Sequence, residues 1–155
     1  MSGLLRFVFL LALALWIGEI VFFSFVVAPS IFGVLDAAHA GQAVGAILPR
    51  YYSLGANAAL VALVAAAMLA QRAATPGPWA AASACIVLGL ATTLWAGAVV
   101  QPRAQLLRTT LQASGRAPMS DPDFQRLHRN ALLLNGAALV AGLAGLGLSA
   151  AAFRH

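Results

Sequence analysis

The stretch LALALWIGEIVFFSFVVAPSIF, residues 11–32, is apolar almost without a break. Between residues 7 and 28 Glu19 is the one ionisable side chain, and 22 helical residues at about 1.5 Å each span about 33 Å, close to one bilayer core. A secretory signal peptide has a shorter apolar core, of about 7 to 15 residues. The stretch therefore predicts a retained transmembrane helix with Glu19 near the membrane midplane.

The composition extends this prediction to the whole chain. Of its 155 residues 62% are hydrophobic and 8% are charged, and the mean hydropathy is +0.90, far above that of a soluble domain. Apolar runs long enough to cross a bilayer occupy residues 7–28, 52–70, 79–100 and 131–153. We therefore predict an all-α, integral membrane four-helix bundle of up-down topology. It forms a single domain, 1–155, with helices at about 4–28, 50–71, 79–112 and 121–152.

The connections between these helices differ in length. Pro29 marks a kink or an end of the first helix, and residues 30–49 form a semi-apolar connection in which a short helix is expected at 36–48, before Pro49. Residues 71–78, QRAATPGP, form a tight turn. The third connection, 102–118, suits a helix that leaves the membrane or lies on its surface.

The arginines indicate an orientation. The first and third connections, with the polar ends of the adjoining helices, carry Arg50, Arg103, Arg108, Arg116, Arg126 and Arg129. The termini and the second connection carry Arg6, Arg72 and Arg154. By the positive-inside rule we predict that the first and third connections are cytoplasmic, in a bacterial inner membrane. The few charges are those left outside the bilayer, so the basic balance does not indicate a nucleic-acid partner.

Small residues recur every fourth position in two helices. The stripes are Gly89, Thr93 and Gly97 in the third helix, and Ala137, Ala141, Gly145 and Ser149 in the fourth. Such stripes let helix backbones approach closely. They serve either packing within the chain or a homo-oligomer face. The other partner that we predict is the lipid bilayer around the helices.

Polar residues gather at one end of the predicted bundle. In an up-down chain the first and third connections lie on the same side, which brings together Arg50, Tyr51, Tyr52, Asn57, Gln101, Arg103, His128 and Asn135. His128 and Asn135 are seven residues apart and share a helix face. We predict a polar vestibule at this end, with Glu19 as its floor.

Glu19 itself has two readings. An ionised carboxylate at a helix centre costs about 2.5 to 3.5 kcal/mol, so Glu19 is protonated, paired or facing water. It is either a proton carrier or a protonated side chain that hydrogen-bonds a neighbouring helix.

Three blocks of the sequence resemble the transmembrane protein 205-like family of small four-helix membrane proteins. They are LWIGEIVFFSFVVAPSIF (15–32), AGQAVGAILPRYYSLG (40–55) and DFQRLHRNALLLN (123–135), in the family's order and approximate spacing. The resemblance implies a membrane bundle without an established biochemical activity, and Glu19 departs from the small residue common in the family at that place. The positions that match the family pattern are Phe25, Pro29, Phe32, Gly41, Pro49, Tyr52, Phe124, His128 and Asn135.

Three functions remain open. The first is a small-solute or proton-linked transport or permeation module that uses the polar vestibule. The second is a bundle that binds haem or porphyrin through His39 or His128, and the third is a scaffold or assembly factor without a substrate. The sequence shows no catalytic Ser/His/Asp set, and its methionines, cysteine and histidines have no metal-ligand spacing, so we expect no enzyme and no metal site.

Overall fold

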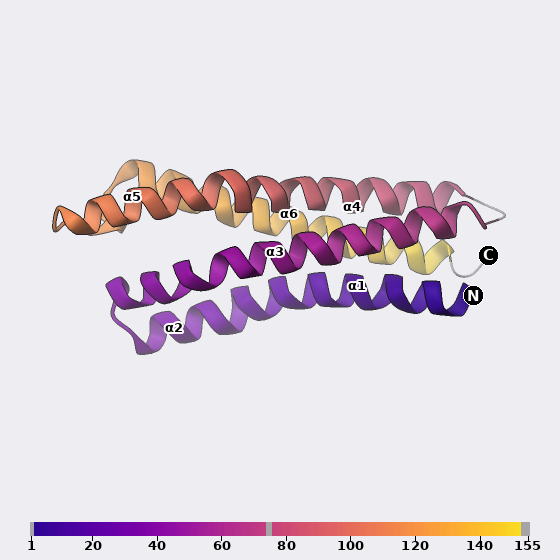
Figure 1. The fold of residues 1–155 in the computed structure, drawn as a ribbon, viewed down its shortest axis with the longest axis horizontal. Helices are drawn as coiled ribbons and strands as arrows, with labels where there is room; N and C mark the ends of the chain where they lie inside the picture. The colour runs from indigo at the N-terminus through magenta and orange to yellow at the C-terminus, as the bar shows by residue number, and fades with distance from the viewer. Residues whose placement is uncertain (1, 74–75, 153–155) are drawn as a thin grey trace.

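The chain forms a bundle of four long helical rods, seen in a computed structural model that describes residues 2–73 and 76–152 (Figure 1). Each rod is long and apolar enough to cross a membrane, and the described residues contain no strand. The start of the first rod and the end of the fourth lie at one end of the bundle, and the first and third connections lie at the other. The predicted all-α bundle and its up-down course are confirmed.

The first and third rods share one construction, an α-helix that widens into a π-helix and then narrows again. In chain order the first rod consists of α1 (Ser2–Phe22), the π-helix η1 (Phe23–Val27) and α2 (Ala28–Val34). The third consists of α4 (Gly77–Trp95), the π-helix η2 (Ala96–Val100) and α5 (Gln101–Ala113). Pro29 and Pro102 are the second residues of the α-helices that follow the two π-helices. Because a proline ring clashes with the carbonyl four residues earlier, a widened preceding turn lets the rod continue. Pro29 therefore does not end the first rod.

The second rod is longer than the sequence indicates. α3 (Ala37–Ala70) continues through Pro49, so residues 36–48 are not a separate short helix and the connection is a sharp turn at Leu35 and Asp36. The reason lies in tertiary packing, since Gly41 and Gly45 in these first turns are buried beneath side chains of α5. The fourth rod, α6 (Pro122–Ala152), follows a short 3-10 helix, η3 (Pro118–Ser120).

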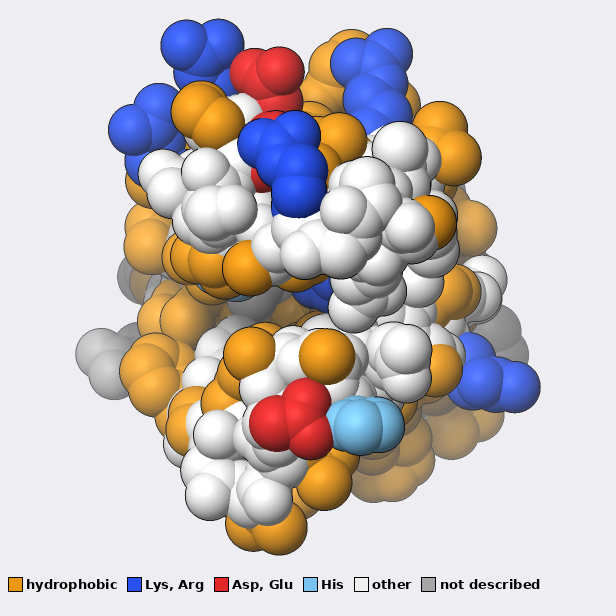
Figure 2. All heavy atoms as spheres, turned by 90° about the vertical axis from the view of Figure 1, so that its left-hand side faces the viewer, with side chains coloured by type: hydrophobic (Ala, Val, Ile, Leu, Met, Phe, Trp, Pro, Cys, Tyr) orange, Lys and Arg blue, Asp and Glu red, His pale blue; other side chains and the backbone are white. Residues whose placement is uncertain are grey.

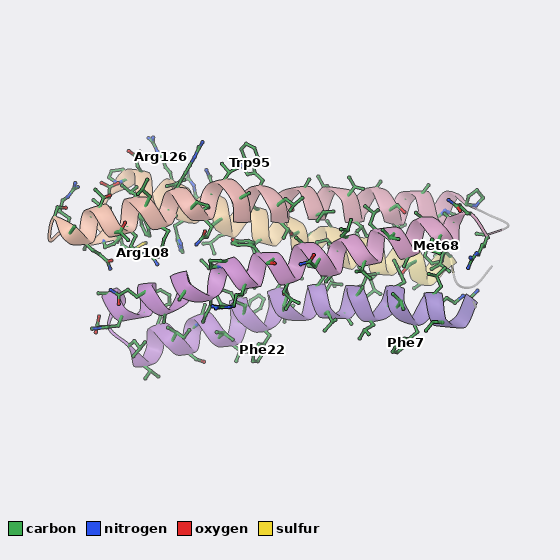
Figure 3. The ribbon with its side chains drawn as sticks, in the orientation of Figure 1. Phe7, Phe22, Met68, Trp95, Arg108 and Arg126 are labelled. Atoms are coloured by element: carbon green, nitrogen blue, oxygen red, sulfur yellow. The ribbon has the colours of Figure 1, made fainter. Side chains whose placement is uncertain are left out.

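The centre of the bundle is built around Trp16, whose side chain is fully buried. Glycines of all three other rods face its ring: a Cβ added at Gly55, Gly89 or Gly142 would lie 3.4, 2.4 or 3.7 Å from an atom of the indole. Around Trp16 the interior is filled with apolar side chains, which include Phe9, Leu13 and Ile86. By contrast, the labelled Phe7, Phe22 and Trp95 project outward (Figure 3).

The small-residue stripes lie mainly inside the bundle. Gly89 of α4 faces Ala141 of α6, and an added Cβ would lie 3.1 Å from the Ala141 methyl group. Gly145 faces Ile86 at 3.3 Å in the same way, and Gly97 faces Tyr52 of α3. The stripes therefore serve packing within the chain.

The rods are longer than a bilayer is thick. The 34 residues of α3 span about 51 Å, whereas a hydrocarbon core is about 30 Å thick. The segments α2 and α5 and the first turns of α3 and α6 gather at the end opposite the start of α1 (Figure 1). That end carries the arginine-rich connections, while Arg154, counted at the other end, lies outside the described residues.

Candidate functional site

A cavity opens at the polar end of the bundle, between the pair α2–α3 and the pair α5–α6. Figure 2 shows this end as a cleft between two masses of side chains, with basic side chains above it and a basic group inside it. The inner part, which we call the end cavity, has a volume of about 190 Å³. It shares Phe32, Arg108, Phe124 and His128 with a wider outer hollow of about 820 Å³. The end cavity is thus an inner chamber below an open mouth.

Arg108 of α5 is the cation of the end cavity. Its Nη1 donates a hydrogen bond to the carbonyl oxygen of Gly41, and its guanidinium carbon lies 5.3 Å from the centre of the Phe124 ring. An added Cβ at Gly41 would lie 3.3 Å from that carbon, so a glycine lets the guanidinium approach α3. Figure 3 shows Arg108 on the side of α5 that faces α3, whereas Arg126 points away from the bundle. Among residues 2–73 and 76–152 no carboxylate forms a salt bridge with Arg108.

The inner wall of the cavity is a chain of hydrogen bonds that joins three rods. The hydroxyl of Tyr51 donates to Oδ1 of Asn135, and Nδ2 of Asn135 donates to Oγ of Ser24 over 3.0 Å. The Phe23 ring stacks against Tyr51 with 4.8 Å between the ring centres. All four residues line the cavity, and Ser24 belongs to the π-helix η1. The wall is therefore polar, while the bundle core around Trp16 is packed with apolar side chains.

The remaining polar lining comes from amides and one histidine. Gln101 and Gln105 of α5 line the cavity, and Gln105 lies over Gly45, where an added Cβ would be 2.7 Å from its Oε1. The His128 ring stacks on Phe124, with 6.5 Å between the ring centres, and is exposed at the mouth. The end cavity thus combines one cation, several hydrogen-bonding groups and aromatic walls.

The structure brings together five of the nine residues predicted for the vestibule. They line the end cavity and are Tyr51, Tyr52, Gln101, His128 and Asn135. Arg50 and Asn57 instead line a shallow groove on the outer face of α3, and Arg103 is exposed and lines neither chamber. The rotation of each rod about its axis decides which residues face inward, and the spacing alone did not fix it.

Glu19 does not line the cavity of which it was expected to be the floor. Its carboxyl group packs on α3 at Gly55, where an added Cβ would overlap Oε1. Oε2 is buried and has no hydrogen-bond partner. Tyr51, one helical turn before Gly55 on α3, donates its hydroxyl hydrogen bond to Asn135.

The positions that resemble the transmembrane protein 205-like pattern fall mainly at the same end. Phe32 and Phe124 line the cavity, and Gly41 accepts the hydrogen bond of Arg108. Pro29 follows the π-helix η1, and Pro49 lies in the groove on α3. Phe25 is 70% exposed and faces away from the cavity.

Three polar lining residues are not among those predicted for the vestibule: Ser24, Gln105 and Arg108. Arg108 was counted only as a charge outside the membrane. A usable signal was present, because Gln101, Gln105 and Arg108 stand at positions i, i+4 and i+7 and so share one helix face.

The two histidines considered for haem are not brought together. His128 lines both chambers, whereas His39 lines neither and its Nδ1 hydrogen-bonds Oδ2 of Asp36. Asp36 caps α3 by accepting from the backbone N–H groups of Ala38 and His39, and its side-chain bond to His39 lowers the pKa of the carboxyl. The described residues hold no cluster of three or more potential metal ligands.

Comparison with known proteins gives one match. A family model described as a domain of unknown function (DUF4149) matches residues 11–113, more than half of the chain. The match includes the first two of the three blocks quoted above and ends before the third. No curated protein and no solved structure matches the chain.

Proposed function

The chain belongs to the DUF4149 family, a domain family of unknown function, so we propose its role from the geometry of the end cavity. It is a non-catalytic membrane module that binds an anionic amphiphile in that cavity. The observation that carries this proposal is the guanidinium of Arg108. It lies half-buried in a cavity, and its partners within residues 2–73 and 76–152 are a carbonyl oxygen and an aromatic ring.

The chemistry of the cavity selects the charge of the ligand. A guanidinium has five N–H donors in a planar fork that matches a phosphate or a carboxylate. One of these donors is used by Gly41, and no carboxylate of the described chain takes the others. An anionic head group at this place would also accept hydrogen bonds from Gln105 and Gln101 in the lining.

The walls select an apolar body next to the charge. Phe23, Phe32 and Phe124 line the cavity together with Val44 and Leu48. A solute with an anionic head and an apolar chain would satisfy both kinds of surface. α5, which borders the cavity, carries Arg103 and Arg108 after the apolar run that ends at residue 100. This is why we prefer an amphiphile to a small hydrophilic anion.

The binding test compares two ligands that share one chain. Wild-type protein in phosphatidylcholine nanodiscs is titrated with dodecyl phosphate and with dodecyl maltoside, whose head group is uncharged. Charge-assisted hydrogen bonds contribute about 1.5–3 kcal/mol, so Arg108→Gln should weaken dodecyl phosphate binding by about tenfold or more. Arg108→Lys should lose less. The matched control is Arg103→Gln on the same helix, which should leave binding unchanged because Arg103 lies outside the cavity. Equal binding by wild type and Arg108→Gln refutes the proposal.

We further propose that binding is the loading step of a small-solute permeation module whose arginine-rich end faces the cytoplasm. The narrower resemblance to the transmembrane protein 205-like family implies no established activity, so this role is proposed from the cavity alone. Movement of a fluorescent alkyl phosphate between the leaflets of proteoliposomes tests it. If wild-type protein binds dodecyl phosphate but does not move the alkyl phosphate between leaflets, permeation is refuted and a binding or scaffold role takes its place. The structure does not bring His39 and His128 together, so the geometry does not favour the haem alternative.

A further inference from the structure

Two polar atoms in the interior of the bundle lack hydrogen-bond partners, and they belong to neighbouring side chains. They are Nε1 of Trp16 and Oε2 of Glu19, both buried. Residues three apart on an α-helix face the same side, so the two side chains stand one above the other on α1. An unpaired buried polar group costs about 1–3 kcal/mol, so two adjacent ones call for an explanation.

The two atoms are chemically complementary. An indole N–H is a donor only, and a carboxyl oxygen is an acceptor. Both side chains also border the same glycine of α3: an added Cβ at Gly55 would overlap Oε1 of Glu19 and lie 3.4 Å from Cδ1 of Trp16, the atom next to Nε1. The absence of a side chain at Gly55 leaves room for these polar groups between the two rods.

No charged group of the described chain stabilises an ionised Glu19. It forms no salt bridge and no hydrogen bond within residues 2–73 and 76–152. The hydroxyl of Tyr51, on the same rod as Gly55, donates to Asn135 and not to Glu19. A bare carboxylate at this depth is costly, whereas a neutral carboxylic acid is not.

From these contacts we propose that Glu19 and Trp16 form a buried proton-binding site, in which Glu19 holds a proton and its carbonyl oxygen accepts a hydrogen bond from Trp16 Nε1, directly or through one water molecule. The site lies outside the end cavity and stands independently of the ligand proposed for that cavity. Tyr51, one turn from Gly55 on α3, connects the site to the cavity wall.

A hydrophobic carbodiimide tests the proton. The reagent reacts with protonated carboxyl groups inside a membrane: the acid proton moves to one nitrogen, the carboxyl oxygen bonds to the central carbon, and rearrangement gives a stable N-acylurea without a leaving group. Mass spectrometry of peptides from wild-type protein in bilayers should locate the adduct on Glu19. Glu19→Gln should carry no adduct at that position, and the exposed Asp36 serves as an internal control that stays unmodified. An unmodified Glu19 would overturn the proposal.

Infrared spectroscopy tests the part played by Trp16. Wild-type protein should show the carbonyl stretching band of a protonated carboxylic acid, absent from Glu19→Gln. In Trp16→Phe the band should shift to higher frequency because the hydrogen bond to the carbonyl is gone. Trp95→Phe, which alters a lipid-facing indole that is 58% exposed, should leave it in place. An unshifted band in Trp16→Phe refutes the role of Trp16. If that variant does not fold, ultraviolet resonance Raman spectra of the wild type report the Nε1 hydrogen bond, and a spectrum of only free indole N–H groups refutes it equally.

Discussion

Replacing Gly89 by alanine probes the packing around Trp16 with a single methyl group. The added Cβ would lie 2.4 Å from Cη2 and 2.9 Å from Cζ2 of the indole, and 3.1 Å from the Ala141 methyl group. Carbon atoms in contact are normally about 3.5–4.0 Å apart, so the ring or α4 must move by about 1 Å. Trp16 has little room to retreat, because it is fully buried and borders Gly55 and Gly142.

The matched control is Gly136→Ala in α6, where an added Cβ meets no atom within 4 Å. Both substitutions gain the same helix propensity, about 0.5–1 kcal/mol, so this contribution cancels when the two variants are compared. What remains is the cost of overpacking, about 1–3 kcal/mol. For a chain of this size the Gly89→Ala variant should melt about 2–12 °C below Gly136→Ala.

The assay is unfolding in mixed micelles, followed by near-ultraviolet circular dichroism as the proportion of sodium dodecyl sulfate or the temperature rises. Equal stability of the two variants would mean that Trp16 does not fill the space opposite Gly89. The arrangement of glycines around the indole would then be wrong.

Further predictions concern the polar end. Asn135→Leu leaves the buried hydroxyl of Tyr51 unpaired and should lower the free energy of unfolding by about 1–3 kcal/mol. Adding Tyr51→Phe to this variant should recover part of that loss in the same unfolding assay. If the effects of the two substitutions on the free energy of unfolding simply add, the hydrogen bond is contradicted. The pKa of Asp36 is lowered in the folded chain, so its cap should protect the first amides of α3 at neutral pH and lose that protection as the pH falls through the lowered value, below 3.8. Hydrogen exchange should show this loss in wild type and no pH-dependent protection in Asp36→Ala. Protein expressed with haem should show no Soret band, and a band that disappears in His128→Ala would reverse that expectation.

The bundle could be predicted from the sequence because the signals for it are local. Length and hydropathy of the runs beginning at residues 7, 52, 79 and 131 suffice to indicate membrane-spanning helices, and the described residues of each run lie within one rod. Helix ends were harder to predict. Pro49 taken alone indicates the end of a short helix at 36–48, but the buried glycines before it pack against α5 and α3 is continuous.

The candidate site could be predicted only in part, because the sequence does not fix the rotation of each rod. His128 and Asn135 are expected on one face, since seven residues are close to two helical turns, and both line the cavity. Arg108 was assigned to a surface segment because charges near connections are usually solvated. Its inward direction depends on Gly41 and Phe124, which belong to two other rods.

The central claim is that Arg108 holds the anionic head of a ligand in the end cavity, and a measurement of proximity tests it most directly. Protein labelled with ¹⁵N-arginine is reconstituted in phosphorus-free bilayers of a neutral glycolipid with dodecyl phosphate as the only source of phosphorus, and the dephasing of guanidinium ¹⁵N signals by ³¹P is recorded. We predict a dephased signal in wild type that persists in Arg103→Gln and disappears in Arg108→Gln. Dephasing that is the same in wild type and Arg108→Gln, or absent from both, would contradict the account.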